Sequence, residues 1–303
     1  MPTIKNQTLT LSEDKKLVLK QILHWFEFKT DQQQYLTIGG YAGTGKTTLI
    51  AVLRRLLYKK SPKLKVAFAA FTGKATQVLQ NYLTEFDLLY QQDSISTIHS
   101  LIYSVVKNEQ QQIVAWRKKD RLQTDLIIVD EASMIDQEIW QDLLSYQIPI
   151  IAVGDHGQLP PVSNTDGFNL MGKPQLKLET IHRQAEDSDI IRISKMARER
   201  GYIPRGIYSP NVFKLSWDIP KCKEIFSGIK HDEDIVVLCG MNKTRVGINS
   251  TIRRKLKFTR PEPYPTERLV CLKNNRSSKI MNGQLGTLVW LTYAGKDIFD
   301  ITV

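Results

Sequence analysis

The chain has 303 residues, 42% of them hydrophobic and 24% charged, with a formal net charge of +11 at pH 7. This length and composition predict a globular protein of about two domains. No apolar run approaches the ~18 residues of a membrane span, and the N-terminus carries no signal-peptide pattern. These features argue against a membrane protein, so we expect a cytoplasmic protein with no membrane partner.

The excess of basic residues favours a polyanionic partner, of which nucleic acid is the most common, although a generally basic soluble protein would show the same charge. Three cysteines, Cys222, Cys239 and Cys271, are widely spaced and form no Cys-x-x-Cys pair. This argues against a disulfide framework or a cysteine zinc site. The basic residues gather at residues 59–65, 117–121 and 243–260.

The first predicted helix runs from an N-cap at Ser12 to about Phe26, and a short β-prone run follows at residues 35–38. That run leads into Gly-Tyr-Ala-Gly-Thr-Gly-Lys-Thr at residues 40–47, and apolar residues at helical spacing continue to about Lys60. Two glycines five residues apart, followed by Lys and Thr and placed between a strand and a helix, are the pattern of a phosphate-binding loop.

This loop predicts ATP and Mg²⁺ as cofactors. Its backbone N–H groups and the N-terminus of the following helix attract phosphate oxygens. Lys46 supplies a positive charge for the outer phosphates, and the Thr47 hydroxyl is a candidate Mg²⁺ ligand. The predicted nucleotide contacts are Gly40, Ala42, Gly43, Thr44, Gly45, Lys46, Thr47 and Thr48.

A second strand, loop and helix follow. Residues 66–71 form a continuous apolar run, as expected of a buried parallel strand, and the run ends at Thr72-Gly73-Lys74 before a helix that begins near Ala75. Loops at the carboxyl ends of parallel strands are where such folds bind ligands. Residues 93–121 differ in character and predict a small hairpin, or two short strands, inserted between sheet units.

The next apolar run, residues 126–129, ends in Asp130-Glu131. Paired with the phosphate-binding loop upstream, these carboxylates predict the second half of a nucleotide site. Asp130 would hold Mg²⁺ through its water shell, and Glu131 would polarise the attacking water.

A further strand at residues 148–153 leads to a polar loop that contains Asp155 and Gln158. Because this loop would lie at the same edge of the sheet as the carboxylates, Gln158 could donate to a phosphate and accept from water. The alternative is a plain turn in which Asp155 acts as a cap.

The pattern changes after residue 182, where a second domain is expected. A helix at about residues 188–199, a strand at 234–239 and a helix at about 243–256 are predicted, with short strands over 267–303. The expected domains are therefore 1–182, with the hairpin at about 100–121, and 183–303. The fold class is α/β, with a parallel sheet at the phosphate-binding loop.

In this order the motifs resemble those of superfamily-one DNA helicases, in the branch of RecD and the phage Dda helicase. The resemblance covers residues 11 to about 287. It implies a RecA-like first domain, a second RecA-like domain and 5′-to-3′ movement on single-stranded DNA, with duplex forks as substrates and replication or recombination proteins as candidate partners. The motif residues besides the phosphate-binding loop are Thr72-Gly73-Lys74-Ala75, Ser96 to His99, Asp130 to Met134, Gly154 to Val162, Arg183-Gln184 and, more weakly, Asn282 to Gly286.

The resemblance also implies roles for single residues. Gln158 would sense the γ-phosphate, and Arg183 would reach the same phosphate, although a surface salt bridge is the alternative for Arg183. A duplex-splitting hairpin is implied at residues 101–121, where Trp116 or Tyr103 could stack on a base or simply pack. The residues implied to line the single-strand track are Thr72, Gly73, Lys74, Thr97 and His99.

Two departures from the family pattern stand out. Lys15 occupies the place of a glutamine that reads adenine in the family, and lysine offers donors only, so we expect weak preference for ATP over other triphosphates. The family's last motifs have no match, so the second RecA-like domain is expected to be truncated and ATP turnover weak.

Three functions are therefore open at this stage. The first is a DNA-stimulated motor that unwinds duplexes, and the second is a truncated helicase-like DNA-binding module that uses ATP as a switch. The third is an unrelated P-loop kinase or transferase, which the Gly154–Val162 loop and the Thr72-Gly73-Lys74 unit disfavour.

Overall fold

The computed structural model describes residues 3–4, 7–8, 11–28, 30–108, 113–161, 167–180, 188–216, 220, 235–272, 280, 282–295 and 298–302. Contacts between Cα atoms divide the chain into two compact units, residues 1–186 and 187–303. The boundary expected from the sequence, between residues 182 and 183, falls in a segment outside the described residues. Two short strands, β1 (Thr3–Ile4) and β2 (Gln7–Thr8), pair antiparallel at the start of the first unit.

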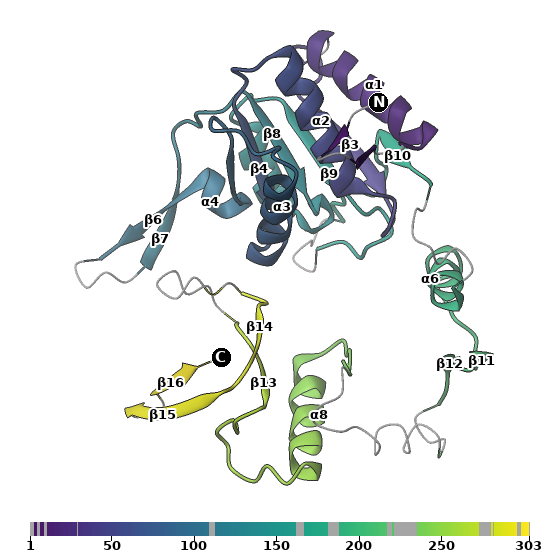
Figure 1. The fold of residues 1–303 in the computed structure, drawn as a ribbon, viewed down its shortest axis with the longest axis vertical. Helices are drawn as coiled ribbons and strands as arrows, with labels where there is room; N and C mark the ends of the chain where they lie inside the picture. The colour runs from purple at the N-terminus through teal and green to yellow at the C-terminus, as the bar shows by residue number, and fades with distance from the viewer. Residues whose placement is uncertain are drawn as a thin grey trace. The chain divides into compact units, whose positions relative to one another are not determined.

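A six-stranded parallel sheet forms the centre of the first unit (Figure 1), in the order β10-β3-β9-β8-β4-β5. The apolar runs recognised in the sequence become its central strands, because a parallel sheet covered on both faces buries every side chain. This confirms the α/β, P-loop NTPase class. The strands are β3 (Tyr35–Gly40), β4 (Val66–Ala70), β5 (Ser94–Thr97), β8 (Leu126–Asp130), β9 (Ile150–Gly154) and β10 (Leu176–Leu178).

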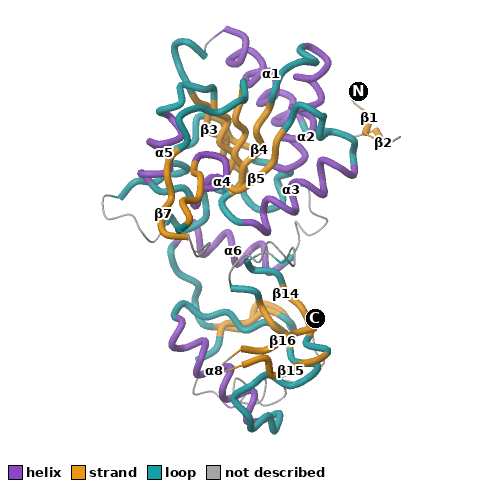
Figure 2. Tube along the Cα trace, turned by 90° about the vertical axis from the view of Figure 1, so that its left-hand side faces the viewer, coloured by secondary structure: helices purple, strands orange, loops and turns teal. Residues whose placement is uncertain are grey.

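Helices cover both faces of this sheet. A hydrophobic core lies on each face, and alternate residues of one strand point into the two cores. Leu126 and Ile128 of β8 pack with the first three helices, whereas Ile127 and Val129 pack with the later ones. Figure 2 shows α2 and α3 on one side of the strands and α5 on the other. The first group is α1 (Glu13–Phe28), α2 (Lys46–Lys60) and α3 (Gly73–Glu85); the second is α4 (Ile98–Ile102), the short 3₁₀ turn η1 (Ala132–Met134) and α5 (Gln137–Leu144).

A buried ion pair fixes α2, the helix that begins at the phosphate-binding loop. The side chains of Arg54 and Asp93 are both 0% exposed, and the guanidinium donates to the two carboxylate oxygens at 2.8 and 2.9 Å. Asp93 also accepts from the backbone N–H of Tyr90, whose ring stacks on Tyr58 at 3.6 Å. Because both charges are hydrogen-bonded, the pair holds α2 against the turn before β5 without an unpaired carboxylate.

A hairpin projects from the second face, in the stretch where the sequence predicts one. Strands β6 (Tyr103–Lys107) and β7 (Ile113–Lys118) pair antiparallel. At its base, the Tyr103 hydroxyl and the Lys118 ammonium both donate to Asp142 of α5. Tyr103 therefore anchors the hairpin to the sheet unit, whereas Trp116 is 51% exposed on β7.

The second unit consists of helices and antiparallel strand pairs among its described residues. One prediction is wrong here: residues 235–239 form no strand, and Val236 and Leu238 are 72% and 90% exposed. The apolar run predicted burial, but no described strand lies beside it to pair with its backbone. The elements are α6 (Asp189–Arg200), β11 (Gly206–Ser209), β12 (Val212–Lys214), α8 (Asn242–Lys255), β13 (Arg268–Val270), β14 (Leu285–Thr287), β15 (Trp290–Gly295) and β16 (Ile298–Thr302). No helix of the described residues is both long and apolar enough to span a bilayer.

Candidate nucleotide-binding site

The register of the sheet brings the predicted motifs to one edge. Gly39 at the end of β3 pairs with Gly154 of β9, while Asp130 of β8 and Thr97 of β5 both lie beside Ala70 of β4. All of these strands are parallel, so the loops that follow them leave the sheet at its carboxyl edge. This is the edge where open α/β sheets bind ligands.

The phosphate-binding loop depends on its glycines. Gly43 and Gly45 adopt φ angles of 87° and 79°, which side-chain-bearing residues avoid. A Cβ atom on Gly40 would lie 2.5 Å from the Thr44 hydroxyl, which is buried and donates to the Tyr41 carbonyl at 2.9 Å. The loop is therefore closed on itself in a conformation that no bulkier residues would allow.

Lys46 begins α2 and bends back over the loop. Its ammonium donates to the carbonyls of Gly40 at 2.8 Å and Tyr41 at 3.2 Å. These hydrogen bonds hold a positive charge at the mouth of the loop, where a phosphate oxygen would take over as the acceptor. Two residues further along α2, the hydroxyl of Thr48 lies 3.0 Å from that of Tyr82, which links α2 to α3.

The acid pair lies on the other side of β9. Asp130 is 8% exposed, and one of its oxygens accepts from the backbone N–H of Glu131 at 2.9 Å. Burial raises the pKa of Asp130 to about 6, and the charge of Glu131 adds to the increase while Lys46 opposes it. Glu131 has a φ of 54°, uncommon for a residue with a side chain and typical of strained functional positions.

The loop after β9 supports the acid pair. The Gln158 amide lies 3.5 Å from a Glu131 carboxylate oxygen. Asp155 accepts from the backbone N–H of Gly157 at 2.8 Å, as the alternative interpretation of a capped turn requires. Its own backbone N–H and carbonyl both bond the Ser133 hydroxyl, which ties this loop to the turn after Asp130.

These groups surround one cavity of about 410 Å³, large enough for a nucleotide. The cavity unites the phosphate-binding loop, the acid pair and the loop after β9. Gly40 and Thr44 do not line the cavity, but their close contact fixes the conformation of the loop. Arg183 lies outside the described residues. The lining residues are Ala42, Gly43, Gly45, Lys46, Thr47, Thr48, Asp130, Glu131, Asp155 and Gln158.

The donor set suits a magnesium ion. Thr47 and Asp130 present a hydroxyl and a carboxylate to the same cavity, and Mg²⁺ prefers a few protein oxygens with water in its other positions. The raised pKa of Asp130 shows that the protein alone stabilises this buried carboxylate poorly. A divalent cation in the cavity would supply the missing positive charge.

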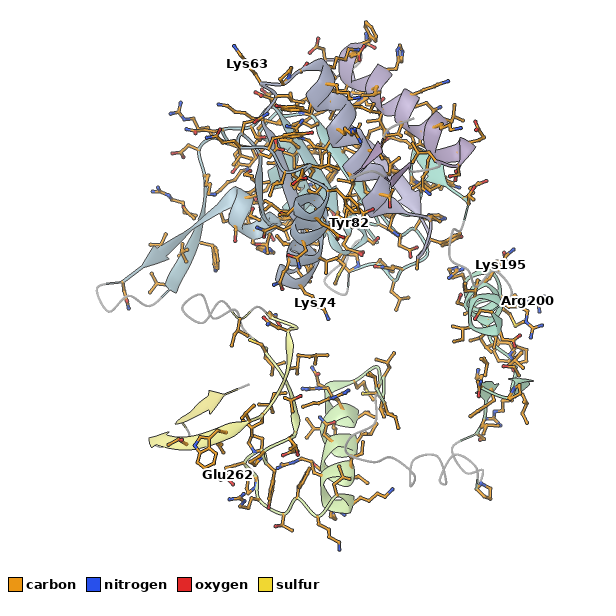
Figure 3. All side chains as sticks on the ribbon, viewed as in Figure 1. Lys63, Lys74, Tyr82, Lys195, Arg200 and Glu262 are labelled. Carbon is orange, nitrogen blue, oxygen red and sulfur yellow. The ribbon has the colours of Figure 1, made fainter. Side chains whose placement is uncertain are left out.

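The residues predicted to line a single-strand track lie at the other end of the same edge. Thr72 caps α3 by accepting from the Ala75 N–H, and Thr97 caps α4 by accepting from the Ser100 N–H, each at 3.2 Å. Lys74 is exposed and extends outward from the first turn of α3 (Figure 3).

The remaining two predicted track residues, Gly73 and His99, differ in exposure. Gly73 is buried at the start of α3, whereas the exposed His99 ring lies 6.1 Å from Phe71 and 5.9 Å from Tyr103. None of the five predicted track residues lines the nucleotide cavity.

Two residues near the cavity were missed as site residues by sequence reasoning. Asp155 lines the cavity, and its position at the end of a buried strand was the available signal. Lys15 is buried beside Gly45, and its signal was a lysine in the apolar stripe that Val18, Leu19 and Ile22 define on α1.

Comparison with known proteins identifies the family. A model of the AAA domain family matches residues 19–206. The RecBCD enzyme subunit RecD of Buchnera aphidicola subsp. Schizaphis graminum is 31% identical over 191 residues, which cover 55% of this chain and 30% of that protein. The ATP-dependent DNA helicase dda of Enterobacteria phage T4 is 30% identical over 137 residues, 44% of this chain and 29% of that protein.

Among solved structures, Pif1 from a Bacteroides species in complex with ADP-AlF4 aligns over 97% of this chain and 72% of its own, with 18% identity and a TM-score of 0.47. The chain spans less than a third of the length of the RecD and dda relatives. Since the family model covers more than half of the chain, the chain belongs to the AAA domain family, and its similarity to RecD and dda agrees with the resemblance to superfamily-one helicases.

Proposed function

We propose that the protein is an ATP-dependent DNA helicase or translocase, in which single-stranded DNA stimulates ATP hydrolysis and hydrolysis drives 5′-to-3′ movement and duplex unwinding. The observation that carries the proposal is the single cavity formed by Lys46, Thr47, Asp130, Glu131 and Gln158. Phosphoryl transfer to water requires groups that bind the phosphates and carboxylates that hold the metal and polarise the water, and this cavity contains both.

In the proposed reaction, the Lys46 ammonium leaves the Gly40 and Tyr41 carbonyls and binds the outer phosphates. Thr47 and Asp130 would hold Mg²⁺, which neutralises charge on the phosphates when bound. Glu131 orients and polarises the attacking water, and the Gln158 amide beside it senses the γ-phosphate.

The strained backbone of Glu131 holds its carboxylate ready before substrate arrives. Arg183 remains the proposed arginine at the same phosphate.

The proposed DNA track runs along the carboxyl edge over β4 and β5, with Thr72, Gly73, Lys74, Thr97 and His99 as contacts. Support comes from the exposure of Lys74 and His99 and from the two helix N-termini that Thr72 and Thr97 cap. Phosphate contacts of this kind make affinity depend on salt and only weakly on sequence.

The test compares the wild-type chain with Lys46→Ala, measuring ATP hydrolysis with and without single-stranded DNA and the unwinding of forks with 5′ or 3′ tails. We expect DNA to stimulate wild-type turnover and only the 5′-tailed fork to open. Lys46→Ala should lower turnover by at least ~100-fold, because it removes the charge that meets the phosphates in the transition state.

Lys63→Ala is the matched control, since this exposed lysine lies before β4, at the opposite end of the strand from the cavity. It should leave turnover and unwinding unchanged. DNA binding and ATP binding without DNA-stimulated turnover would reject the motor and favour a nucleotide-controlled binding module. Turnover that transfers phosphate to an acceptor other than water would reject both.

A further inference from the structure

Lys15 is a buried lysine on an apolar helix face. It lies three, four and seven residues before Val18, Leu19 and Ile22, which all pack into the core, and it is itself only 4% exposed. The next residue, Lys16, is the ordinary case: its side chain is 48% exposed and its ammonium donates to Glu13 at 2.6 Å. The enclosed stem leaves the ammonium partly desolvated, which is costly unless a partner stabilises its charge.

The described part of the chain supplies little such stabilisation. No hydrogen bond or ion pair to a described residue is made by the Lys15 ammonium. The nearest opposing charge, Asp14, accepts from the backbone N–H groups of Glu179 at 3.1 Å, Thr180 at 3.0 Å and Lys15 itself at 2.8 Å. Burial lowers the pKa of Lys15, and Asp14 only partly opposes this.

The ammonium reaches the phosphate-binding loop. A Cβ atom on Gly45 would lie 2.9 Å from both Cε and Nζ of Lys15 and 3.8 Å from Cβ of Thr48. Gly45 and Thr48 line the cavity, and Gly45 precedes the first turn of α2. A helix N-terminus with free N–H groups and an unpaired cation beside it form an anion site.

We propose that Lys15 is a second cationic contact to the polyphosphate of the bound nucleotide, acting beside Lys46. This deepens the proposed function and rests on its nucleotide site. The ligand group is the phosphate chain shared by all nucleoside triphosphates. An ammonium has donors only, so Lys15 does not match the donor and acceptor pattern of one base. ATP and GTP therefore bind with similar affinity.

Lys15→Met tests this role, because methionine keeps an unbranched apolar stem in the core and removes the charge. Lys16→Met is the matched control one residue away. The measurement is displacement of a fluorescent ADP analogue from the full chain with Mg²⁺ and without DNA, using ATP, GTP and inorganic tripolyphosphate as competitors. Thermal melting of each apo protein shows whether the variants fold.

We expect Lys15→Met to lower the affinity for all three competitors by the same factor of about 10, the effect of losing one hydrogen bond to a charged group. Lys16→Met should leave the affinity for all three competitors unchanged. The melting temperature of apo Lys15→Met should equal or exceed that of the wild type, because an unpaired and partly desolvated charge has been removed. Lower affinity in an equally stable protein separates a ligand contact from a packing role.

Two outcomes would overturn the proposal. If Lys15→Met weakens the binding of ATP and GTP but not that of tripolyphosphate, Lys15 contacts the nucleoside. If the affinity of no competitor falls, Lys15 contacts no part of the ligand. The assay contains no DNA, so a failure of the protein to unwind DNA does not affect this result. If the wild type binds ATP tightly and Lys15→Met binds it with the same affinity, the inference about Lys15 is wrong while the proposed nucleotide site stands.

Discussion

Two ends of one sheet edge, one proposed to bind a nucleotide and the other single-stranded DNA, differ in how far their polar groups are exposed. At the nucleotide end, over β3, β9 and β8, polar groups such as Asp130 and Thr44 are buried and hydrogen-bonded within the protein. At the proposed DNA end, over β4 and β5, Thr72, Lys74 and His99 are exposed. A small ligand gains from enclosure in a low dielectric, whereas a polymer needs an open surface to slide along.

The difference sets the size of the effects expected from mutation. A buried charge interacts strongly with its ligand and is costly to the apo protein, so its removal should change activity and stability in opposite directions. An exposed charge is screened by water and salt, so its removal should change affinity moderately and leave stability unchanged.

Asp130→Asn should give the largest contrast. We expect ATP turnover to fall by at least ~100-fold, because the amide is a poor Mg²⁺ ligand in a site built for a carboxylate. Apo stability should rise, because the pKa of about 6 means that the folded protein binds more protons than the unfolded chain between pH 3.8 and 6. The cost of ionised Asp130 is therefore present above pH 6 and absent below pH 3.8.

The measurement is thermal melting in EDTA at pH 8 and pH 4, together with steady-state ATP hydrolysis. The variant should melt higher than the wild type at pH 8, and this advantage should shrink at pH 4. Equal melting temperatures at pH 8 would contradict the account of Asp130 as a poorly stabilised charge.

Lys74→Ala should have an intermediate effect at the open end of the edge. Loss of one phosphate contact should weaken single-stranded DNA binding by about 3- to 10-fold and reduce the slope of log affinity against log salt by ~0.7. The measurement is DNA binding at several salt concentrations by fluorescence anisotropy. Lys63→Ala, which removes an exposed lysine from the opposite end of β4 (Figure 3), is the control. Equal losses in the two variants would mean that Lys74 contributes only general charge.

The sequence signals for the cavity at the nucleotide end are local, and the structure brings the motifs that carry them together. The phosphate-binding loop needs glycines at fixed spacing, and Gly43 and Gly45 do adopt positive φ. The buried strands before Asp130 and Gly154 are continuous apolar runs, and only a parallel sheet buries such runs on both faces. The meeting of these motifs at one edge then follows from parallel topology.

Features that depend on distant parts of the chain were not predictable in this way. The apolar run at residues 235–239 has the composition of a strand, but a strand needs a neighbour to pair with, and composition does not reveal one. Lys15 was aligned with a family position that reads adenine, and the fold places its ammonium beside Gly45 of the phosphate-binding loop. The contact of Thr48 with Tyr82 spans 34 residues and carries no sequence signal.

Tyr82→Phe tests whether the two ends communicate, and its expected effect is the smallest. The Tyr82 hydroxyl lies 3.0 Å from that of Thr48 in the nucleotide cavity, and the same helix, α3, begins beside Lys74 (Figure 3). Without this hydrogen bond, the factor by which single-stranded DNA changes ATP affinity should be roughly two- to fivefold smaller than in the wild type, since one such bond contributes ~0.5–1 kcal/mol.

Tyr208→Phe is the control, because it removes a hydroxyl that bonds the Pro204 carbonyl in the second unit. The measurement is ATP affinity with and without saturating DNA. Linkage requires that ATP change DNA affinity by the same factor, so both directions must agree. If Tyr82→Phe lowers ATP affinity equally with and without DNA, the bond only supports the nucleotide cavity. The two ends would then be coupled through the sheet itself, since Asp130 and Thr97 flank the same residue of β4.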